Sequence, residues 1–440
     1  MKRWLSQAGF TLAGVILGVN GSATSVLASG FAISEQSVKG LGTAFSSSST
    51  DIEDATAIFF NPAGLANFSG NSVVLGGSFI APKIEFENRG TTAFSGAPIR
   101  GGNGGDAAPN AIAPTVYAAF DLSGSVKVGI GVNAPFALST DYSSDWVGRY
   151  EALKSELQTI NINPTIAAKL SDQFSIGAGL NVQYAKAELS NAIDFGTIGR
   201  RVGLPTVPQG ADGRIDIQGE DWSVGYNLGL MYTPSANTRI GLAYRSGITH
   251  DLRGNADFTV PSSVAALTRR GQFVDTGASA RLKTPDTISL GAFQRVSPQV
   301  ALVGDVTWTN WSRFQELRVD FDNPAQPAVV QPENWKDTFR VGLGVNYDVS
   351  PALTFRAGVA FDPSPVRDQF RTARIPDSDR TWIAIGASYR PSPSISLDIG
   401  YAHLFVKNAS IDQVGSTGDR LRGEYSSNVN IIGVQTAWRF

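Results

Sequence analysis

The sequence predicts an all-β fold: a transmembrane antiparallel β-barrel of about 14 strands with an N-terminal hatch, or plug, inside its lumen. Three observations predict it. Apolar and polar residues alternate from Asn71 to the last residue, short and long connections separate the alternating runs, and a segment without alternation precedes them. We therefore divide the chain into a signal peptide (1–28), a hatch (29–70) and a barrel (71–440).

The composition agrees with a barrel and argues against several other classes of protein. Charged residues make up 17% of the 440 residues, below the roughly 25% of soluble domains. Mean hydropathy is -0.05, the near-zero average that results when lipid-facing apolar residues alternate with polar or small lumen-facing ones. A net charge of -2 gives no indication of a nucleic-acid partner, which requires a clustered basic surface. Because the chain has no cysteine and only 2 histidines, we expect no disulfide, metal or cofactor.

The N-terminus has the pattern of a secretory signal peptide. Lys2 and Arg3 form a basic start that leads into a short apolar core at 10–19, and the tripeptide Val-Leu-Ala at 26–28 fits a small-residue cleavage site. The alternative is a single membrane anchor, but about ten apolar residues cannot span a ~30 Å hydrocarbon core as a helix. We expect cleavage after Ala28 and a final location in the bacterial outer membrane.

Period-two alternation predicts the strands. Between Trp222 and Tyr232, for example, apolar and aromatic side chains occupy every second position, and mostly Gly, Ser and Asn lie between them. A strand that faces lipid on one side and a lumen on the other has this pattern. Such runs lie near 72–86, 112–121, 126–134, 158–170, 174–188, 221–233, 239–252, 281–295, 299–312, 338–349, 352–361, 381–390, 395–406 and 428–440.

The connections between these runs alternate in length. Tight turns at 121–125, 171–173, 234–237, 297–299, 349–351 and 391–394 alternate with long connections near 87–111, 135–157, 189–220, 253–280, 313–337, 362–380 and 407–427. Outer-membrane barrels have short periplasmic turns and long extracellular loops, whereas a soluble β-sandwich has no reason to put every long loop at one end. Two loop segments, Glu151 to Leu157 and Ser262 to Arg270, look helical and would form either an outer capture groove or plain solvated loops.

The last strand ends the chain with an aromatic residue. Ile432, Val434, Thr436, Trp438 and Phe440 share one face, with aromatic residues at the end where an interfacial girdle lies. A terminal aromatic residue on an amphipathic last strand resembles the signal that the barrel-assembly machinery reads. We therefore expect that machinery as a partner through Phe440, with outer-membrane lipid and lipopolysaccharide around the finished barrel.

Residues 29–70 break the alternation. They contain a Ser-rich run, an acidic patch (Asp51, Glu53 and Asp54) and the sequence Phe-Phe-Asn-Pro-Ala-Gly at 59–64. A barrel of about 14 strands is wider than the eight-stranded kind that side chains alone can fill, and lumen-facing positions here are rich in Gly, Ser and Ala. The segment is therefore predicted to plug the lumen. A disordered periplasmic tail is the alternative, and the apolar residues spread through the segment argue against it.

Short motifs follow one another along the mature chain. They are Gly30 to Gln36, Gly40 to Ala44, Asp54 to Ala55, Asn61 to Gly64, Trp146 to Tyr150, Tyr244 to Ser246, Trp335 to Asp337, Phe361 to Val366 and Ile375 to Arg380. Each motif is weak alone, but their joint order resembles the FadL family of outer-membrane transporters for long-chain fatty acids and other hydrophobic compounds. The resemblance implies a transporter that takes up hydrophobic small molecules passively through an apolar lumen pocket, and not an enzyme.

The resemblance also implies lateral release into the membrane through a gap in the barrel wall at the third strand. In that family an Asn-Pro-Ala stretch of the hatch lies beside a kink in this strand. Its counterpart here is Asn61-Pro62-Ala63, facing a third strand that ends at Asn133 and Pro135. Proline cannot donate to a strand ladder, so Pro135 marks a strand end or a break, with an ordinary turn as the alternative. Phe31 is expected either to contact the pocket and move or simply to pack in the hatch.

A cargo with a carboxylate would need a cation, because an unpaired buried charge is costly. Arg340 and Arg356, at lumen-facing positions, and Lys336, near a strand end, are the candidates. The alternative is that they pair with the acidic patch of the hatch. No family carboxylate-binding pair matches basic residues here, so neutral hydrocarbons and aromatics stay open as cargo.

Two other functions remain as alternatives. A general diffusion porin would favour a charged, open lumen over an apolar hatch. An outer-membrane lipid hydrolase would need a catalytic base, and the two histidines, His250 and His403, are expected on the outward face near the extracellular ends of strands. A place in the girdle or at the rim suits such positions better than catalysis.

Overall fold

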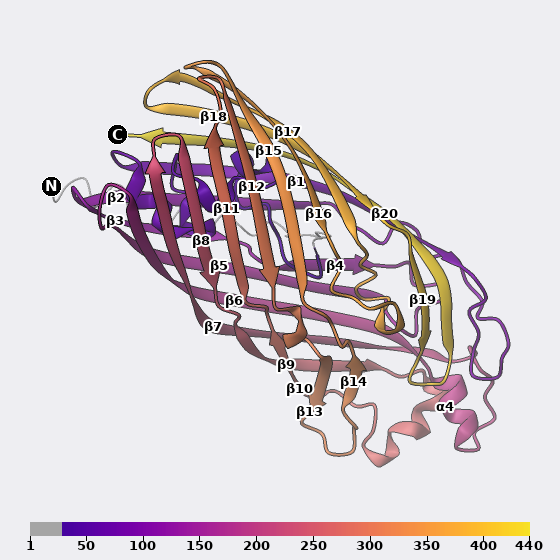
Figure 1. The fold of residues 1–440 in the computed structure, drawn as a ribbon. Coiled ribbons are helices and arrows are strands. Elements are labelled where there is room, and N and C mark those ends of the chain that lie inside the picture. The colour runs from indigo at the N-terminus through magenta and orange to yellow at the C-terminus, as the bar shows by residue number, and fades with distance from the viewer. Residues whose placement is uncertain (1–28) are drawn as a thin grey trace.

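The structure is a computed structural model that describes residues 29–440, so the predicted signal peptide lies outside the described residues. One antiparallel sheet of 20 strand segments closes into a barrel, because its first strand pairs with both the second and the last (Figure 1). Six barrel strands consist of two consecutive segments, so the barrel has 14 strands, and the predicted antiparallel β-barrel is confirmed. Within residues 29–440, no helix combines the length and the apolar character needed to cross a membrane.

The barrel strands differ widely in length, and six of them are interrupted and consist of two segments each. They are β1 (Ser72–Asn88), β2 (Ala111–Ser123), β3 (Val126–Asn133) with β4 (Ala137–Asp141), β5 (Lys154–Lys169), β6 (Phe174–Asp194), β7 (Asp212–Ser235), β8 (Thr238–Arg245) with β9 (Thr249–Thr259), β10 (Thr276–Lys283) with β11 (Thr287–Arg295), β12 (Val300–Thr309) with β13 (Glu316–Phe321), β14 (Val329–Pro332) with β15 (Thr338–Ser350), β16 (Leu353–Asp362), β17 (Arg380–Ser392), β18 (Ile395–Val406) with β19 (Ala409–Val414), and β20 (Arg420–Arg439). Short helices precede the strands or lie between them: α2 (Val38–Leu41), η1 (Ser48–Thr50), α3 (Ala57–Phe60), η2 (Pro62–Asn67), α4 (Phe195–Arg201), η3 (Ser262–Arg270), η4 (Trp311–Arg313) and η5 (Asp368–Phe370).

The two ends of the barrel differ, as the connection lengths predict. The C-terminus lies at one end, and α4, β13, β14 and β19 lie toward the other (Figure 1). Each predicted tight turn joins neighbouring strands, for example β2 to β3 and β17 to β18. The predicted long loops are shorter than expected, since β6 continues to Asp194 and β7 begins at Asp212. Exposed charged residues such as Arg214 and Asp216 stand there in place of the apolar ones that mark lipid-facing strands.

One of the two predicted loop helices is present. Ser262–Arg270 forms the 3-10 helix η3. The prediction for Glu151 to Leu157 is wrong, because β5 begins at Lys154 and pairs with β6 from Ser155 onward. The Glu-Ala-Leu-Lys run contains good helix formers, but helix propensity is a weak preference that pairing with neighbouring strands overrides.

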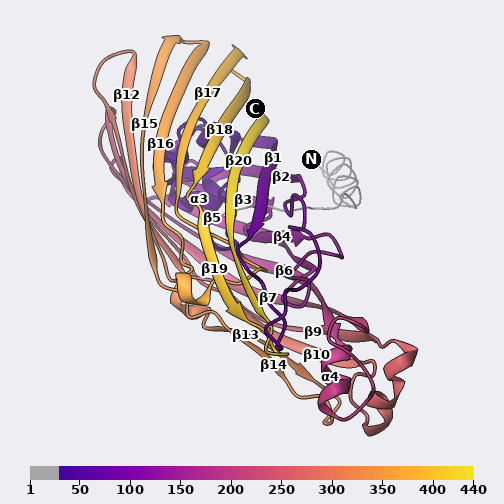
Figure 2. The same ribbon diagram turned by 90° about the vertical axis from the view of Figure 1, so that its right-hand side faces the viewer.

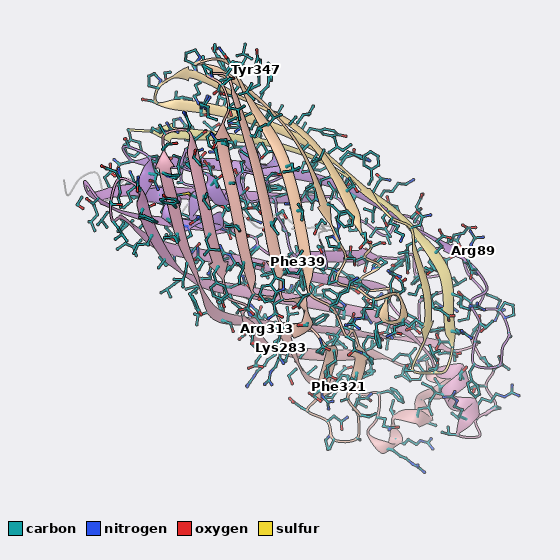
Figure 3. All side chains as sticks on the ribbon, viewed as in Figure 1. Arg89, Lys283, Arg313, Phe321, Phe339 and Tyr347 are labelled. Atoms are coloured by element: carbon teal, nitrogen blue, oxygen red, sulfur yellow. The ribbon has the colours of Figure 1, made fainter. Side chains whose placement is uncertain are left out.

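The outward face of the barrel is an apolar belt with aromatic residues near its edges. On β15, Val341 and Leu343 lie between Phe339 and Tyr347, and each of these four side chains is at least 44% exposed. Figure 3 shows Phe339 and Tyr347 toward the two ends of this strand. Exposed apolar surface of this extent is stable against lipid, so the belt marks the membrane-spanning part of the barrel.

Residues 29–70 lie inside the barrel, and most of them are buried (Figure 2). Inward-facing glycines let this segment approach the wall. A Cβ atom on Gly229 would lie 2.1 Å from Oδ1 of Asn61, and a Cβ atom on Gly241 would lie 2.0 Å from the carbonyl oxygen of Ser49. Because a side chain cannot occupy either space, the small residues at these lumen positions are a requirement of the packing.

Candidate functional site

The third barrel strand is broken by one extra residue. Asn133, the last residue of β3, pairs with Asn161 of β5, and Ala137, the first residue of β4, pairs with Gln158. The chain therefore advances four positions on the third strand against three on β5, which is the signature of a bulge. Pro135 lies within the break and has no N–H to donate to a ladder, as the sequence predicts.

Residues 31–33, which we call the N-terminal segment, take the place of a strand partner at this break. The N–H of Ile33 donates to the carbonyl oxygen of Pro135 at 2.8 Å, and the N–H of Ala137 donates to the carbonyl oxygen of Phe31 at 3.0 Å. On the neighbouring side of the wall, the pairing of β2 with β3 stops at Val116, although β2 itself begins at residue 111. Hydrogen bonds from the N-terminal segment thus replace a continuous ladder at this place in the wall.

Aromatic rings enclose the side chain of Phe31, which is 1% exposed. Its ring centroid lies 4.8 Å from that of Trp311, 5.5 Å from Trp335, 5.6 Å from Phe314 and 5.8 Å from Phe136. Phe136 belongs to the third-strand break, and the other three rings lie in the connections beside β12 and β15. Phe31 therefore links the break in the wall to the loop end of the lumen.

Replacing Phe31 with Ala should loosen the N-terminal segment from the break. Removal of a fully buried phenylalanine side chain costs about 3–5 kcal/mol. We expect this loss to destabilise the docking of residues 31–33 against the break. We expect faster hydrogen exchange at the amides of Ile33 and Ala137, whose hydrogen bonds close the break. Phe86→Ala, at a buried phenylalanine of β1, is the matched control. Unchanged exchange at both amides in Phe31→Ala would show that Phe31 does not hold the segment in place.

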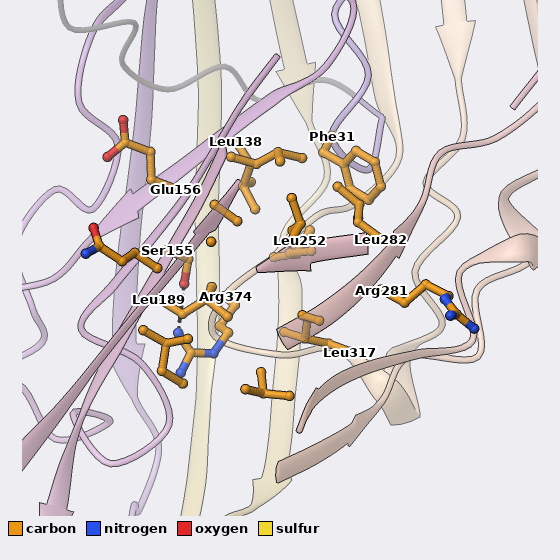
Figure 4. A pocket seen from close by; sticks show the side chains of 18 of the residues that line it. Phe31, Leu138, Ser155, Glu156, Leu189, Leu252, Arg281, Leu282, Leu317 and Arg374 are labelled. Atoms are coloured by element: carbon orange, nitrogen blue, oxygen red, sulfur yellow. Dashed lines mark hydrogen bonds between the residues drawn. The ribbon is translucent and has the colours of Figure 1, made fainter. Parts of the chain in front are cut away.

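An apolar cavity lies beside Phe31 inside the barrel (Figure 4). The space of this first cavity, together with its opening to solvent, amounts to about 810 Å³. Its apolar wall suits a small hydrophobic molecule. The wall consists mainly of aliphatic and aromatic side chains, namely Phe31, Leu138, Leu157, Leu189, Ile217, Leu252, Leu282, Phe314, Leu317, Val319 and Ile375.

Arg374 brings a positive charge to the wall of the first cavity. Its guanidinium donates to the hydroxyl oxygen of Ser155 at 3.1 Å and to the side-chain oxygen of Asn191 at 3.0 Å. Burial lowers the pKa of Arg374 to about 10, so the group stays charged at neutral pH. Arg281 also borders the cavity, but its guanidinium points away (Figure 4) and lies 2.7 Å from the carboxylate of Asp251.

Sequence reasoning missed Arg374. The residue lies in the connection between β16 and β17, outside the alternating runs in which lumen-facing positions can be counted. Its one signal in the sequence is its position directly before the motif at 375–380. That signal carries no information about a cavity, because the cavity forms from strands far away in the chain.

Asn61-Pro62-Ala63 hydrogen-bonds to the strands β6 and β7. The side-chain amide of Asn61 donates to the carbonyl oxygen of Leu230 on β7 at 3.2 Å, and the hydroxyl of Ser175 on β6 donates to the carbonyl oxygen of Ala63 at 3.1 Å. Residues 31–33 hydrogen-bond to the third-strand break. Asn61 accepts from the N–H of Ala63 and caps η2, which agrees with the alternative of a local turn.

The three predicted carboxylate contacts lie at separate places. Arg356 is buried and lies 3.8 Å from the carboxylate of Glu53, so the alternative of pairing with the acidic patch holds for this residue. Arg340 faces the lumen and donates to the carbonyl oxygen of Ala44 at 2.5 Å. Lys336 is exposed and lies outside the wall of the first cavity. These three cations therefore do not form one site.

The two histidines face opposite sides of the wall. His403 is on the outward face of β18, as predicted. The prediction for His250 is wrong, because this side chain is fully buried and contacts the side-chain oxygen of Gln183 at 3.0 Å. An extra residue between β8 and β9 inverts the alternation, so a parity counted from β8 gives the wrong face for β9.

Comparisons with known proteins agree with this geometry. A model of the family described as "Outer membrane protein transport protein (OMPP1/FadL/TodX)" matches residues 19–440. An outer-membrane protein of Neisseria meningitidis serogroup B is 32% identical to the chain, over 97% of this chain and 98% of its own length. The "Long-chain fatty acid transport protein" of Escherichia coli O6:H1 is 28% identical, over 90% of this chain and 91% of its own length.

Solved structures share the architecture. A FadL homologue of Pseudomonas aeruginosa has 25% sequence identity and a TM-score of 0.87, over 93% of this chain and 100% of its own. The toluene transporter TodX of Pseudomonas putida, at 16% identity and a TM-score of 0.66 over 88% of this chain and 94% of its own, supports the fold alone.

These matches decide between the functions that the sequence leaves open. The family consists of outer-membrane transporters of hydrophobic compounds, so the predicted outer-membrane location is confirmed and the hydrolase alternative is wrong. The same result disfavours a general porin. The chain belongs to the OMPP1/FadL/TodX family of outer-membrane transport proteins.

Proposed function

We propose that this protein takes up hydrophobic small molecules passively, through the first cavity and then sideways through the third-strand break into the membrane. The observation that carries the proposal is the double role of residues 31–33. They supply Phe31 to the cavity wall and hydrogen-bond to the break. A cargo molecule that displaces Phe31 would therefore also loosen the bonds that close the wall. Burial of the cargo would supply affinity at about 25 cal/mol per Å² of apolar surface.

In this proposal, residues 29–70 act as the hatch and 71–440 as the barrel. Phe31 is the moving part, Asn133 and Pro135 form the rim of the exit, and Asn61-Pro62-Ala63 anchors the hatch to β6 and β7. Residues 1–28 serve as the export signal. The barrel-assembly machinery engages the C-terminal Phe440, which is 68% exposed, and lipid with lipopolysaccharide surrounds the apolar belt.

The cargo class is long-chain fatty acids or related hydrocarbons and aromatics. Both kinds of cargo are named for relatives: long-chain fatty acid for the Escherichia coli protein and toluene for TodX. The apolar wall of the first cavity accepts either. Arg374 has Glu333 beside it in the cavity wall but no direct ion pair, since its guanidinium hydrogen-bonds to Ser155 and Asn191. It therefore favours a cargo with a carboxylate there.

Arg374→Gln should weaken equilibrium binding of a long-chain fatty acid to the purified protein by about 10- to 100-fold, since a hydrogen bond to a charged group contributes about 1.5–3 kcal/mol. Binding of the methyl ester of the same chain should stay within about twofold. Isothermal titration calorimetry gives the measurement, and Arg281→Gln is the control. Equal weakening for acid and ester would assign Arg374 a structural role.

Uptake by cells tests the proposal itself. Bacteria that lack their own transporter of this family and express this protein should accumulate a radiolabelled hydrophobic compound, while the purified barrel gives no large steady current in a planar bilayer. A large steady current would favour the porin. Accumulation no greater than that of cells without the protein would reject the transporter proposal.

A further inference from the structure

A second cavity lies beside the first, and the N-terminal segment separates them. Its space, together with its openings to solvent, amounts to about 1070 Å³. Ala32 and Ile33 line this second cavity, whereas Phe31 lines the first. Pro135 and Phe136 also belong to its wall, so the second cavity extends to the third-strand break.

Arg245 of β8 borders the second cavity with a charge that no nearby carboxylate balances. Its guanidinium donates to the side-chain oxygen of Asn181 and, at 2.6 Å, to the carbonyl oxygen of Phe59. It also lies 4.2 Å from the centroid of the Phe59 ring. Among residues 29–440, no carboxylate oxygen lies within 4.0 Å of this guanidinium. An enclosed cation without a counter-charge is costly, so an anion bound beside it would be favoured.

The other arginines nearby have negative neighbours. Arg340 lines the same cavity together with the carboxylates of Asp305 and Asp362. Arg239, six residues earlier on the same face of β8, is close enough to the acidic patch at 51–54 to interact electrostatically with Asp51 and Glu53. A bound anion is therefore stabilised most strongly beside Arg245.

A row of side-chain amides connects Arg245 with the break. The side-chain oxygen of Asn181, which accepts from Arg245, also accepts from the amide nitrogen of Asn161 at 3.1 Å. That nitrogen lies 3.3 Å from the side-chain oxygen of Asn133, the last residue before the break. The row fixes the direction of the guanidinium and places polar groups between Arg245 and the exit.

We infer that the second cavity is a transit site for the head group of a hydrophobic monocarboxylate, with Arg245 as its cationic contact. This inference rests on the proposed function and narrows its cargo class. The carboxylate leaves Arg374 in the first cavity, passes the displaced N-terminal segment and pairs with Arg245 before the molecule enters the membrane. A neutral hydrocarbon would leave Arg245 without a counter-charge, so contact with Arg245 would add no binding free energy.

The test compares two arginines of β8 in the full-length protein. Arg239 and Arg245 face the same side of one strand, and each donates to a backbone carbonyl of residues 29–70 and lies over a phenylalanine ring. Initial uptake rates of a radiolabelled long-chain fatty acid and its methyl ester are measured in cells that express wild type, Arg245→Gln, Arg245→Lys or Arg239→Gln. Equal amounts of folded barrel in the outer membrane are verified for each variant.

We expect Arg245→Gln to slow uptake of the acid by about tenfold or more, because a charge-assisted hydrogen bond is lost. Uptake of the ester should stay within about twofold of the wild-type rate. Arg245→Lys should recover most of the acid uptake. Arg239→Gln should change the uptake rates of the acid and the ester to the same extent. Equal slowing of both cargoes, or of neither, would overturn the inference, as would a wild type that takes up only the ester. If wild type took up neither cargo, the proposed function would fail instead.

Discussion

Deletion of Pro135 should abolish most uptake while the barrel still assembles. The third strand holds one residue more than β5 between the pairs Asn133–Asn161 and Ala137–Gln158. Removing one residue equalises the two sides, so β3 can continue into β4 without changing which side chains face the lumen. A continuous ladder would close the proposed exit route, and we therefore expect initial uptake to fall by about tenfold or more.

Pro135→Ala is the matched control for this deletion. It restores a backbone N–H but keeps the extra residue, so the break and most of the uptake should remain. Heat-dependent migration on denaturing gels verifies that both variants form barrels. Normal uptake by a correctly assembled deletion variant would show that cargo leaves the lumen by another route.

Lys39→Met should release the hatch from the barrel. The ammonium of Lys39 is buried, 2.6 Å from the carboxylate of Asp51 and 2.9 Å from that of Asp54, and Glu53 of the same patch lies 3.3 Å from Arg390 of the wall. Removing one partner of a buried ion pair costs about 3–5 kcal/mol, because the remaining charges stay buried without compensation. We expect a steady ionic current in planar bilayers that wild type does not give.

A charge-neutral variant provides the control for Lys39→Met. When Asp51→Asn and Asp54→Asn are added, the uncompensated charges are removed, and the current should return toward the wild-type level. Lys83→Met, at an exposed ion pair with Glu85, should have no effect on the current. If Lys39→Met gave no steady ionic current in a planar bilayer, other contacts would suffice to hold residues 29–70 in the lumen.

Alternation reveals the strands of this chain and fails where it shifts phase. Lipid on one face and a lumen on the other impose period two, so β7 and β15 were predictable from hydrophobicity alone. Arg245 and His250, however, both face inward although they are five positions apart, because the break between β8 and β9 holds an extra residue. Gly247 is compatible with a bulge, but glycine also occupies regular strand positions such as Gly241 on β8, so the face of His250 could not be predicted.

The site was predictable only where a residue type has a local consequence. Pro135 breaks a ladder wherever it occurs in one, which made the break visible in the sequence. The cations were not predictable, since their charge balance depends on distant segments. Arg356 pairs with Glu53 of the acidic patch and is unavailable to a ligand, while Arg374 reaches the first cavity from a loop. Folding, not spacing in the sequence, decides which arginine a cargo meets.

A crystal structure with a bound cargo analogue tests the central claim most directly. A long-chain fatty acid that carries bromine at its terminal carbon gives an anomalous signal at the end of the chain. The proposal predicts a bromine peak in the first cavity, among Leu252, Leu282 and Leu317, with the carboxylate beside Arg374. A bromine peak confined to the outer apolar belt, in crystals of protein that supports uptake in cells, would contradict a passage through the lumen.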